Sequence, residues 1–226
     1  MNILALETST KHFSLAVSSG GKVIAAREIE LKTVLSDAII PAIEHILKKS
    51  KLTLEKIDGF AVGLGPGSFT SLRVGLSTVK ALAFVTKKPV VGISSLDVLA
   101  AGVQEKGEEQ ICTIIDARRN LLYACLFQKK GDALKKKTPY LLCSIDELLK
   151  KIDCPTIFVG DGIVTTNSLD GKKEQQVSFV DKKLWYPQAA DLARLSEKKF
   201  QEKKFDNPET LIPLYLYPDD CQVGKK

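Results

Sequence analysis

Two short polar segments of this sequence carry groups that can bind a phosphate or a metal ion. The first, Glu7-Thr8-Ser9-Thr10, directly follows the apolar run Ile3-Leu4-Ala5-Leu6, and a second apolar run begins at Phe13. A strand that ends in an acid and hydroxyls and then turns back forms a hairpin, whose hydroxyl and N–H groups can face a phosphate. The Glu7 carboxylate would suit a hydrated magnesium ion. The alternative is a plain polar turn, in which Ser and Thr side chains bond to the backbone.

The second segment is Gly65-Pro66-Gly67-Ser68-Phe69-Thr70, which joins a predicted strand over 59–64 to a predicted helix over 70–86. The backbone N–H groups at the start of such a helix form a generic anion site. The segment is not a Walker A loop, because no Gly-Lys-Ser/Thr follows, and its glycine spacing does not fit a Rossmann fingerprint. The alternative is a tight turn from strand to helix that packs closely on a neighbour.

The helix over 70–86 is apolar on nearly all sides, and its only charged residues are Arg73 and Lys80. Such a helix must be buried on more than one side. Small residues, Gly75 and Ala83 among them, share one face and would let a partner helix approach closely. The alternative is a central helix that is covered entirely within its own chain.

Other chemistry is poorly supported by the sequence. The two histidines, His12 and His45, stand alone, and the five cysteines form no C-x-x-C pair, so no metal site is predicted. Asp116-Ala117-Arg118-Arg119 lies at a predicted turn between two strands. It is either a salt-bridged turn or a contact for phosphate or a partner.

The composition is that of an ordinary globular protein: 226 residues, 44% of them hydrophobic, with a formal net charge of +6. This excludes a wholly disordered, collagen-like or coiled-coil chain. No run approaches the roughly 18 apolar residues that cross a membrane, and the N-terminus does not resemble a secretory signal. We therefore expect a cytoplasmic protein without a membrane partner. Its lysine clusters are either a solvated surface or a weak contact to a polyanion such as RNA.

The order of apolar runs predicts an α/β fold with two related halves. Residues 1–103 show three strands followed by alternating helices and strands, which predicts a mixed sheet flanked by helices. A helix is expected over 36–49, where apolar residues recur at helical spacing. Residues 104–226 partly repeat this plan in reduced form. Their last predicted helix, over 188–200, is a candidate to pack back on the first half.

Several blocks of this sequence also form a familiar pattern. The most specific are Leu4-Ala5-Leu6-Glu7-Thr8-Ser9-Thr10, Val62-Gly63-Leu64-Gly65-Pro66-Gly67-Ser68-Phe69-Thr70-Ser71-Leu72-Arg73-Val74-Gly75 and Pro89-Val90-Val91-Gly92-Ile93-Ser94-Ser95-Leu96. Weaker ones are Asp116-Ala117-Arg118-Arg119, Gly160-Asp161-Gly162 and Pro213-Leu214-Tyr215-Leu216. Together they closely resemble the TsaB (YeaZ-type) family of glycoprotease-like (M22) proteins, from Ile3 to about Tyr217.

This resemblance implies an actin-like ASKHA fold, related to ribonuclease H, and a part in making threonylcarbamoyladenosine (t6A) in tRNA. In that machinery the paralogous catalytic subunit, TsaD, transfers the threonylcarbamoyl group to the adenosine 3′ of the anticodon. TsaB-like proteins pair with TsaD, and an ATPase subunit, TsaE, joins them. The resemblance thus implies a non-catalytic scaffold or dimerisation subunit without a metal site or cofactor of its own. ATP or ADP with magnesium would bind at the complex interface, and tRNA contact would come through the complex.

We expect the helices over 36–49 and 70–86 to form the interface with TsaD, or with a second copy in a homodimer. The candidate contacts are Ile39, Ile43, Leu72, Arg73, Gly75, Leu76 and Val79. On this view the two polar segments are a vestigial phosphate loop made of Glu7, Thr8, Ser9, Thr10, Gly65, Pro66, Gly67, Ser68, Phe69 and Thr70.

Two other functions stay open from the sequence. One is a small ASKHA-type nucleotide-binding phosphotransferase or ATPase that uses Glu7 and the hydroxyls beside it. Glu7 stands where the family usually has Asp, which weakens the inference of nucleotide and magnesium binding. The other is a metalloprotease, as the older family name suggests, and the missing metal ligands argue against it.

Overall fold

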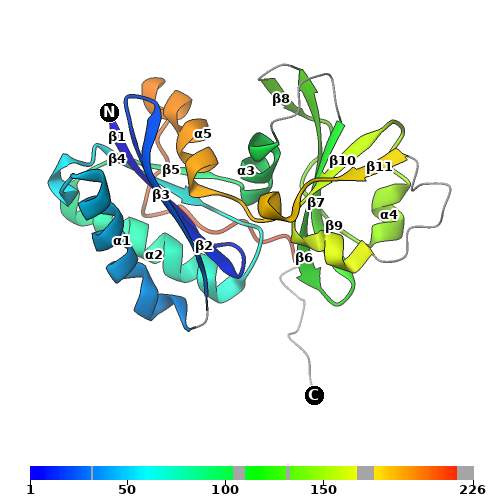
Figure 1. Ribbon diagram of the computed structural model, residues 1–226, viewed down its shortest axis with the longest axis horizontal. Coiled ribbons are helices and arrows are strands. Elements are labelled where there is room, and N and C mark those ends of the chain that lie inside the picture. Colours follow the sequence, from blue (N-terminus) through cyan, green and yellow to red (C-terminus); the bar gives the residue numbers. More distant parts are fainter. Residues whose placement is uncertain (32, 104–109, 131–132, 167–175, 218–226) are drawn as a thin grey trace.

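The computed structural model describes residues 1–31, 33–103, 110–130, 133–166 and 176–217 and contains two β-sheets flanked by helices (Figure 1). The first sheet has the strands β1 (Asn2–Glu7), β2 (His12–Ser19), β3 (Lys22–Glu30), β4 (Gly59–Gly63) and β5 (Val90–Ile93), in the order β3-β2-β1-β4-β5. β1, β2 and β3 pair antiparallel, whereas β1, β4 and β5 are parallel, so the sheet is mixed as predicted. Since β1 and β4 are parallel neighbours in matching register, the two polar segments leave the sheet at the same edge.

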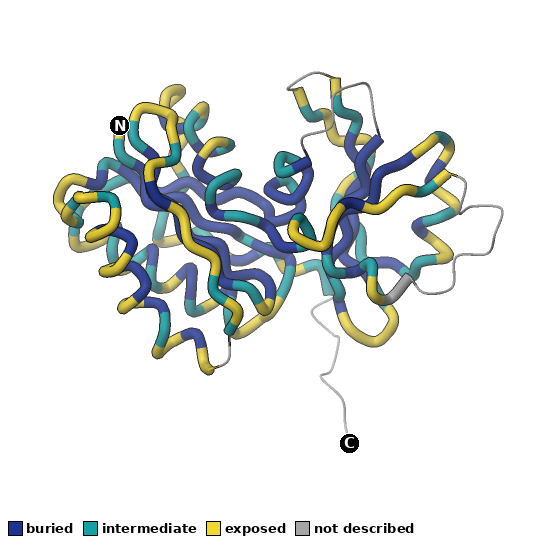
Figure 2. The backbone as a smooth tube through the Cα atoms, viewed as in Figure 1, coloured by how far each residue is buried: buried dark blue, intermediate teal, exposed yellow. Residues whose placement is uncertain are grey.

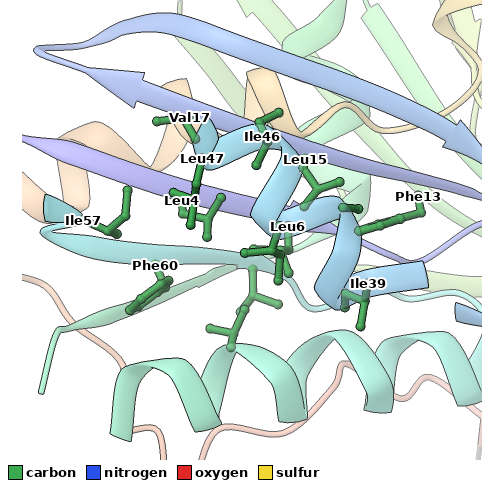
Figure 3. Close-up of a cluster of buried hydrophobic side chains, with 14 of the residues drawn as sticks. Leu4, Leu6, Phe13, Leu15, Val17, Ile39, Ile46, Leu47, Ile57 and Phe60 are labelled. Atoms are coloured by element: carbon green, nitrogen blue, oxygen red, sulfur yellow. The ribbon is translucent and has the colours of Figure 1, made fainter. Parts of the chain in front are cut away.

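Three helices cover the two faces of this sheet (Figure 1): α1 (Leu35–Ser50), α2 (Phe69–Thr86) and α5 (Ala189–Gln201). Alternate side chains of β1 point to opposite faces, as in any strand. Leu4 and Leu6 pack with α1 and α2, and Figure 3 shows both beside side chains of α1. Ile3 and Ala5 pack with α5 on the other face. The helices expected over 36–49, 70–86 and 188–200 are thus present, with each end within one residue of the expected position.

The second sheet has the order β11-β10-β6-β7-β8, and β9 pairs with β7. Its strands are β6 (Gln110–Arg118), β7 (Leu121–Lys130), β8 (Ala133–Lys136), β9 (Leu141–Cys143), β10 (Thr156–Val159) and β11 (Val177–Phe179). Like the first sheet, it combines an antiparallel hairpin, β6 with β7, and a parallel neighbour, β10. The short helix α4 (Ile145–Leu149) packs on it and begins with a capping box between Ser144 and Glu147.

Helix α3 (Ser95–Gly102) lies between the two sheets. Leu96 and Leu99 pack in the core of the second sheet, whereas Val98 packs with the first sheet and α5. Ser94 caps α3, since its Oγ accepts a hydrogen bond from the backbone N–H of Leu96. Figure 2 shows buried backbone in both sheets and in α3.

The chain crosses the molecule once more in residues 206–217, after α5. The N–H of Asp206 donates to the carbonyl of Val90 at 2.9 Å, and that of Leu214 donates to the carbonyl of Leu64 at 2.8 Å. Tyr217 then reaches the second sheet. This C-terminal segment, residues 206–217, therefore contacts both sheets and passes the start of α2 on the way.

The prediction of an α/β fold with two mixed sheets flanked by helices is confirmed. All strands of the first sheet lie within residues 1–103, and the described strands of the second lie within 104–226. α5 comes from the second part of the chain and packs on the first sheet. Among the described residues, no helix is both long enough and apolar enough to span a bilayer.

Candidate functional site

The two polar segments lie against each other, and the first of them faces inward, whereas Ser68, Phe69 and Thr70 of the second are exposed. Glu7, Thr8, Ser9 and Thr10 are all buried, none with more than 5% of its surface exposed. The Thr10 hydroxyl bonds to the backbone N–H and carbonyl of His12, at 3.3 and 3.2 Å. In this respect the hairpin is the plain polar turn that was the alternative interpretation.

The Thr8 hydroxyl of the hairpin forms a hydrogen bond with α2. The Thr8 Oγ1 donates to the Ser71 carbonyl at 3.0 Å, and the Ser68 N–H donates to the Ser9 carbonyl at 2.7 Å. Two glycines allow this approach, because a Cβ on Gly67 would lie 2.1 Å from the Ser9 oxygen and one on Gly75 would lie 2.3 Å from Thr8 Oγ1. Gly75, predicted to contact a partner, is therefore covered by the chain's own β1–β2 turn.

The Glu7 carboxylate sits beneath this contact. One oxygen accepts the N–H of Ser9 at 2.8 Å, and the other accepts the hydroxyl of Ser95 at 2.9 Å. Ser95 Oγ also accepts the N–H of Gly65 at 3.2 Å. Burial raises the pKa of Glu7 above its ordinary value, and the hydrogen bonds from Ser9 and Ser95 oppose this rise. Glu7 thus links β1, the glycine-rich turn and α3.

The histidines lie apart from this cluster. The His12 ring stacks on that of Tyr186, with centroids 3.7 Å apart, and its Nδ1 lies 2.8 Å from a carboxylate oxygen of Glu28. His45 is exposed on α1. Within the described ranges, no three His, Cys, Asp or Glu residues are grouped so that they could hold a metal ion.

Most of the predicted partner contacts are not on the surface. The apolar side chains of Ile39, Ile43, Leu72, Leu76 and Val79 are all buried inside the folded chain, and Figure 3 shows Ile39 within the core. Side chains buried to this extent present almost no surface to a partner, and of the five, Ile39 and Leu76 line the shallow grooves described below. Apolar periodicity shows that a face leaves water, but it does not show whether the same chain or another covers it.

Arg73 is the predicted contact that the structure leaves exposed. Its Nε donates to the Tyr215 hydroxyl at 3.0 Å, and its guanidinium carbon lies 3.8 Å from the centre of the Phe69 ring. The Phe69 and Tyr215 rings are 5.5 Å apart and are 53% and 42% exposed. Arg73 is thus an exposed arginine whose guanidinium lies over the Phe69 ring and is bonded to Tyr215.

Two shallow grooves meet at this arginine. One runs between α1 and α2 and is lined by Ser36, Ile39, Ile40, Arg73, Val74, Ser77 and Thr78. The other runs between α2 and the C-terminal segment and is lined by Arg73, Leu76, Ser77, Lys80, Leu211, Ile212, Pro213 and Tyr215. We call Arg73 and the exposed large apolar and aromatic side chains around it the Arg73 face: Ile40, Phe69, Arg73, Ile212 and Tyr215.

Sequence reasoning placed only Arg73 of the Arg73 face in a partner interface: it assigned Phe69 to the vestigial phosphate loop and missed Ile40, Ile212 and Tyr215. Ile40 directly follows Ile39 and lies off the buried apolar face of α1. The block around Tyr215 was noticed only as part of the family resemblance, because nothing local shows that residue 215 lies beside residue 73.

The turn between β6 and β7 is the salt-bridged turn that the sequence allowed. The Asp116 carboxylate accepts the N–H of Arg118 at 2.8 Å and pairs with its guanidinium at 3.5 Å. The Tyr217 hydroxyl donates to the Ala117 carbonyl at 2.8 Å, so the C-terminal segment holds this turn. Arg118 and Arg119 are exposed.

Comparison with known proteins assigns the family. A family model described as "TsaD: tRNA N6-adenosine threonylcarbamoyltransferase" matches residues 32–222. A protein of Buchnera aphidicola subsp. Schizaphis graminum, named tRNA threonylcarbamoyladenosine biosynthesis protein TsaB, is 31% identical over 195 residues, 84% of this chain and 90% of the relative. The chain belongs to the TsaB family. The TsaB protein of Bacillus subtilis is 30% identical over 220 residues, 96% of this chain and 94% of the relative.

Solved structures agree with TsaB membership at the level of the fold. A structure titled YeaZ from Pseudomonas aeruginosa superposes with a TM-score of 0.77 at 23% identity, and the match covers 95% of this chain and 99% of that one. The family resemblance seen in the sequence is therefore confirmed, and the fold extends over nearly the whole of both chains.

Proposed function

We propose that this chain is the non-catalytic scaffold subunit that pairs with a TsaD-type transferase in the synthesis of t6A in tRNA. The observation that carries the proposal is similarity over nearly full length to relatives named for threonylcarbamoyladenosine biosynthesis. The match to the TsaD family model supports it further, since it relates the chain to the transferase with which it would pair. Modification of tRNA is also the basis for proposing a cytoplasmic location.

The Arg73 face is the contact surface that we propose for the TsaD-type subunit. Aromatic residues and arginine supply most of the binding energy in protein interfaces, and Phe69, Arg73 and Tyr215 already lie in contact here. Exposed apolar side chains at Ile40 and Ile212 extend the surface that a partner would bury. Because α2 carries no acidic residue, the matching partner surface should offer a carboxylate to Arg73.

The other members of the assembly follow from the same proposal. A TsaE-type ATPase would join the pair, ATP or ADP with magnesium would bind at the complex interface, and tRNA would be contacted through the complex. The chain itself would need no cofactor. In the absence of the TsaD-type subunit, the Arg73 face would serve a homodimer, since an exposed apolar surface is prone to self-association.

A nucleotide-binding phosphotransferase or ATPase is the weaker candidate. It would require the hydroxyls of Thr8 and Thr10 to meet a phosphate, whereas both are buried and bonded within the chain. ATP hydrolysis by the isolated chain that is abolished in Glu7→Gln would favour this candidate over the scaffold.

The test is complex formation with the TsaD-type subunit of the same organism, followed by size-exclusion chromatography with light scattering. The wild type is compared with Arg73→Glu and with Lys198→Glu, a charge reversal at an exposed residue of α5 on the opposite face of the sheet. We expect a one-to-one complex for the wild type and Lys198→Glu, and none for Arg73→Glu.

Two results would count against the proposal in different ways. Absence of a wild-type complex, even with nucleotide and the TsaE-type ATPase present, would contradict the scaffold function. Equal loss of binding in both charge reversals would contradict the assignment of the Arg73 face, because Lys198 lies far from it.

A further inference from the structure

We propose that the β1–β2 turn, Glu7 to Thr10, is a positioning element for the partner-binding face, not a phosphate-binding loop. The inference rests on the proposed function, since it assigns the turn to the start of α2, where Phe69 and Arg73 project. Thr8 is the central positioning residue, because its side chain bonds directly to α2.

The turn contacts α2 at the residue midway between the two exposed anchors. Thr8 Oγ1 donates to the carbonyl of Ser71, which lies two residues after Phe69 and two before Arg73. The Ser9 carbonyl accepts the N–H of Ser68, the residue that precedes the helix. No side-chain cap bond is present at Ser68, so the Ser9 carbonyl, which accepts the Ser68 N–H, satisfies a donor at this helix start, and the Thr8 hydroxyl bonds the first turn at a carbonyl.

Buried hydrogen bonds of Glu7 and Ser95 fix the position of the turn itself. Glu7 accepts the Ser9 N–H and the Ser95 hydroxyl, and Ser95 accepts the N–H of Gly65 in the segment that leads into α2. The position of α2 is therefore defined at Gly65, at Ser68 and at Ser71, all from one buried cluster. A helix held at its first turn presents Phe69 and Arg73 in a fixed geometry, which lowers the ordering cost of binding.

Hydrogen bonds within the chain occupy the Thr8 and Thr10 hydroxyls, and the Ser9 hydroxyl, which has no hydrogen-bond partner among the described residues, is buried. Ser9 is buried, its N–H is bonded to Glu7, and its carbonyl lies where a Cβ on Gly67 would be. A phosphate could bind to Thr8 only after the bond to Ser71 broke. The turn and α2 thus exclude a ligand by bonding to each other.

The test uses hydrogen exchange of α2 and the affinity for the TsaD-type subunit in the full-length chain. Thr8→Val replaces the hydroxyl by a methyl of similar size. If the valine variant does not fold, Thr8→Ala is used instead, because it removes the hydroxyl without adding volume. Thr8→Ser keeps the hydroxyl and is the matched rescue variant. We expect amides 72–75 to exchange roughly fivefold faster, and the partner to bind roughly fivefold more weakly, in the first two variants. Both values should return to within about twofold of the wild type in Thr8→Ser.

The outcomes separate this inference from the proposed function. Unchanged exchange in α2 overturns it, whatever the partner does. Faster exchange with unchanged partner affinity also overturns it, because the bond would then be merely structural. Protection of residues 7–10 by Mg-ATP added to the isolated chain would overturn it in favour of a phosphate loop. If the wild type binds no partner, the scaffold function fails, and exchange in α2 alone decides whether the turn positions the helix.

Discussion

Two truncations on the same helix, Leu76→Ala and Phe69→Ala, should separate folding from partner binding. Leu76 is 5% exposed in the core between α1, α2 and the sheet. Replacing a buried leucine by alanine costs about 2–5 kcal/mol of unfolding free energy. For a chain of this size we expect the melting temperature to fall by about 4–20 °C.

Phe69 has the opposite environment, with 53% of its surface in water. Its truncation should change the unfolding free energy by no more than about 0.5 kcal/mol. A partner that covers the exposed half of the residue would remove about 100 Å² of apolar surface from water, worth about 2.5 kcal/mol. Phe69→Ala should therefore weaken binding to the TsaD-type subunit about 60-fold.

Thermal unfolding and isothermal titration calorimetry on the same two preparations measure both quantities. The titration is performed well below the melting temperature of Leu76→Ala, whose affinity should stay within about threefold of the wild type. The reasoning is refuted if Leu76→Ala melts like the wild type but fails to bind, since Leu76 would then face the partner. Wild-type affinity in Phe69→Ala would equally refute the Arg73 face.

Three further predictions follow from single groups. Because burial raises the folded-state pKa of Glu7, its ionisation removes stability as the pH rises from 4.5 through that pKa. The melting temperature of Glu7→Gln should therefore gain on that of the wild type as the pH rises above 4.5, and an unchanged difference would contradict this. Tyr217→Phe loses the bond to the Ala117 carbonyl and should lower the free energy of unfolding in denaturant by about 1 kcal/mol. It should also speed amide exchange in the β6–β7 turn, and unaltered exchange there would contradict a role for Tyr217 in holding this turn. Burial raises the pKa of Cys125 to about 11 and that of Cys112 well above its ordinary range, so mass spectrometry should find both unlabelled by iodoacetamide at pH 8 unless guanidinium is added.

Much of the fold could be predicted because it rests on local patterns. Apolar spacing located α1 and α2 to within about a residue, and the apolar run at residues 3–6 located β1. The paired halves were visible in the order of strands and turns. These features depend on neighbours within a few residues, where helical and extended periodicities leave a direct signature.

The candidate site was predicted less well. The polar segments were expected to meet, and they do, yet the sequence could not show that Thr8 would bond to Ser71 instead of facing a ligand. A hydroxyl side chain suits both purposes equally. The parallel pairing of β1 and β4 brings the β1–β2 turn close to the start of α2, and this proximity allows Thr8 to bond to Ser71.

The sequence by itself determined which faces of the helices leave water and which family the chain resembles. The tertiary structure decided what covers those faces: α1, α2 and the sheet bury Ile39, Leu76 and their neighbours against each other. It also brought Tyr215 to Arg73 across 142 positions of chain. The physical reason is that hydrophobic burial is non-directional. An apolar pattern therefore shows that a side chain is removed from water, but it does not show which residue packs against that side chain. Neighbours far apart along the chain are fixed only when strand order and the path of the C-terminal segment are fixed.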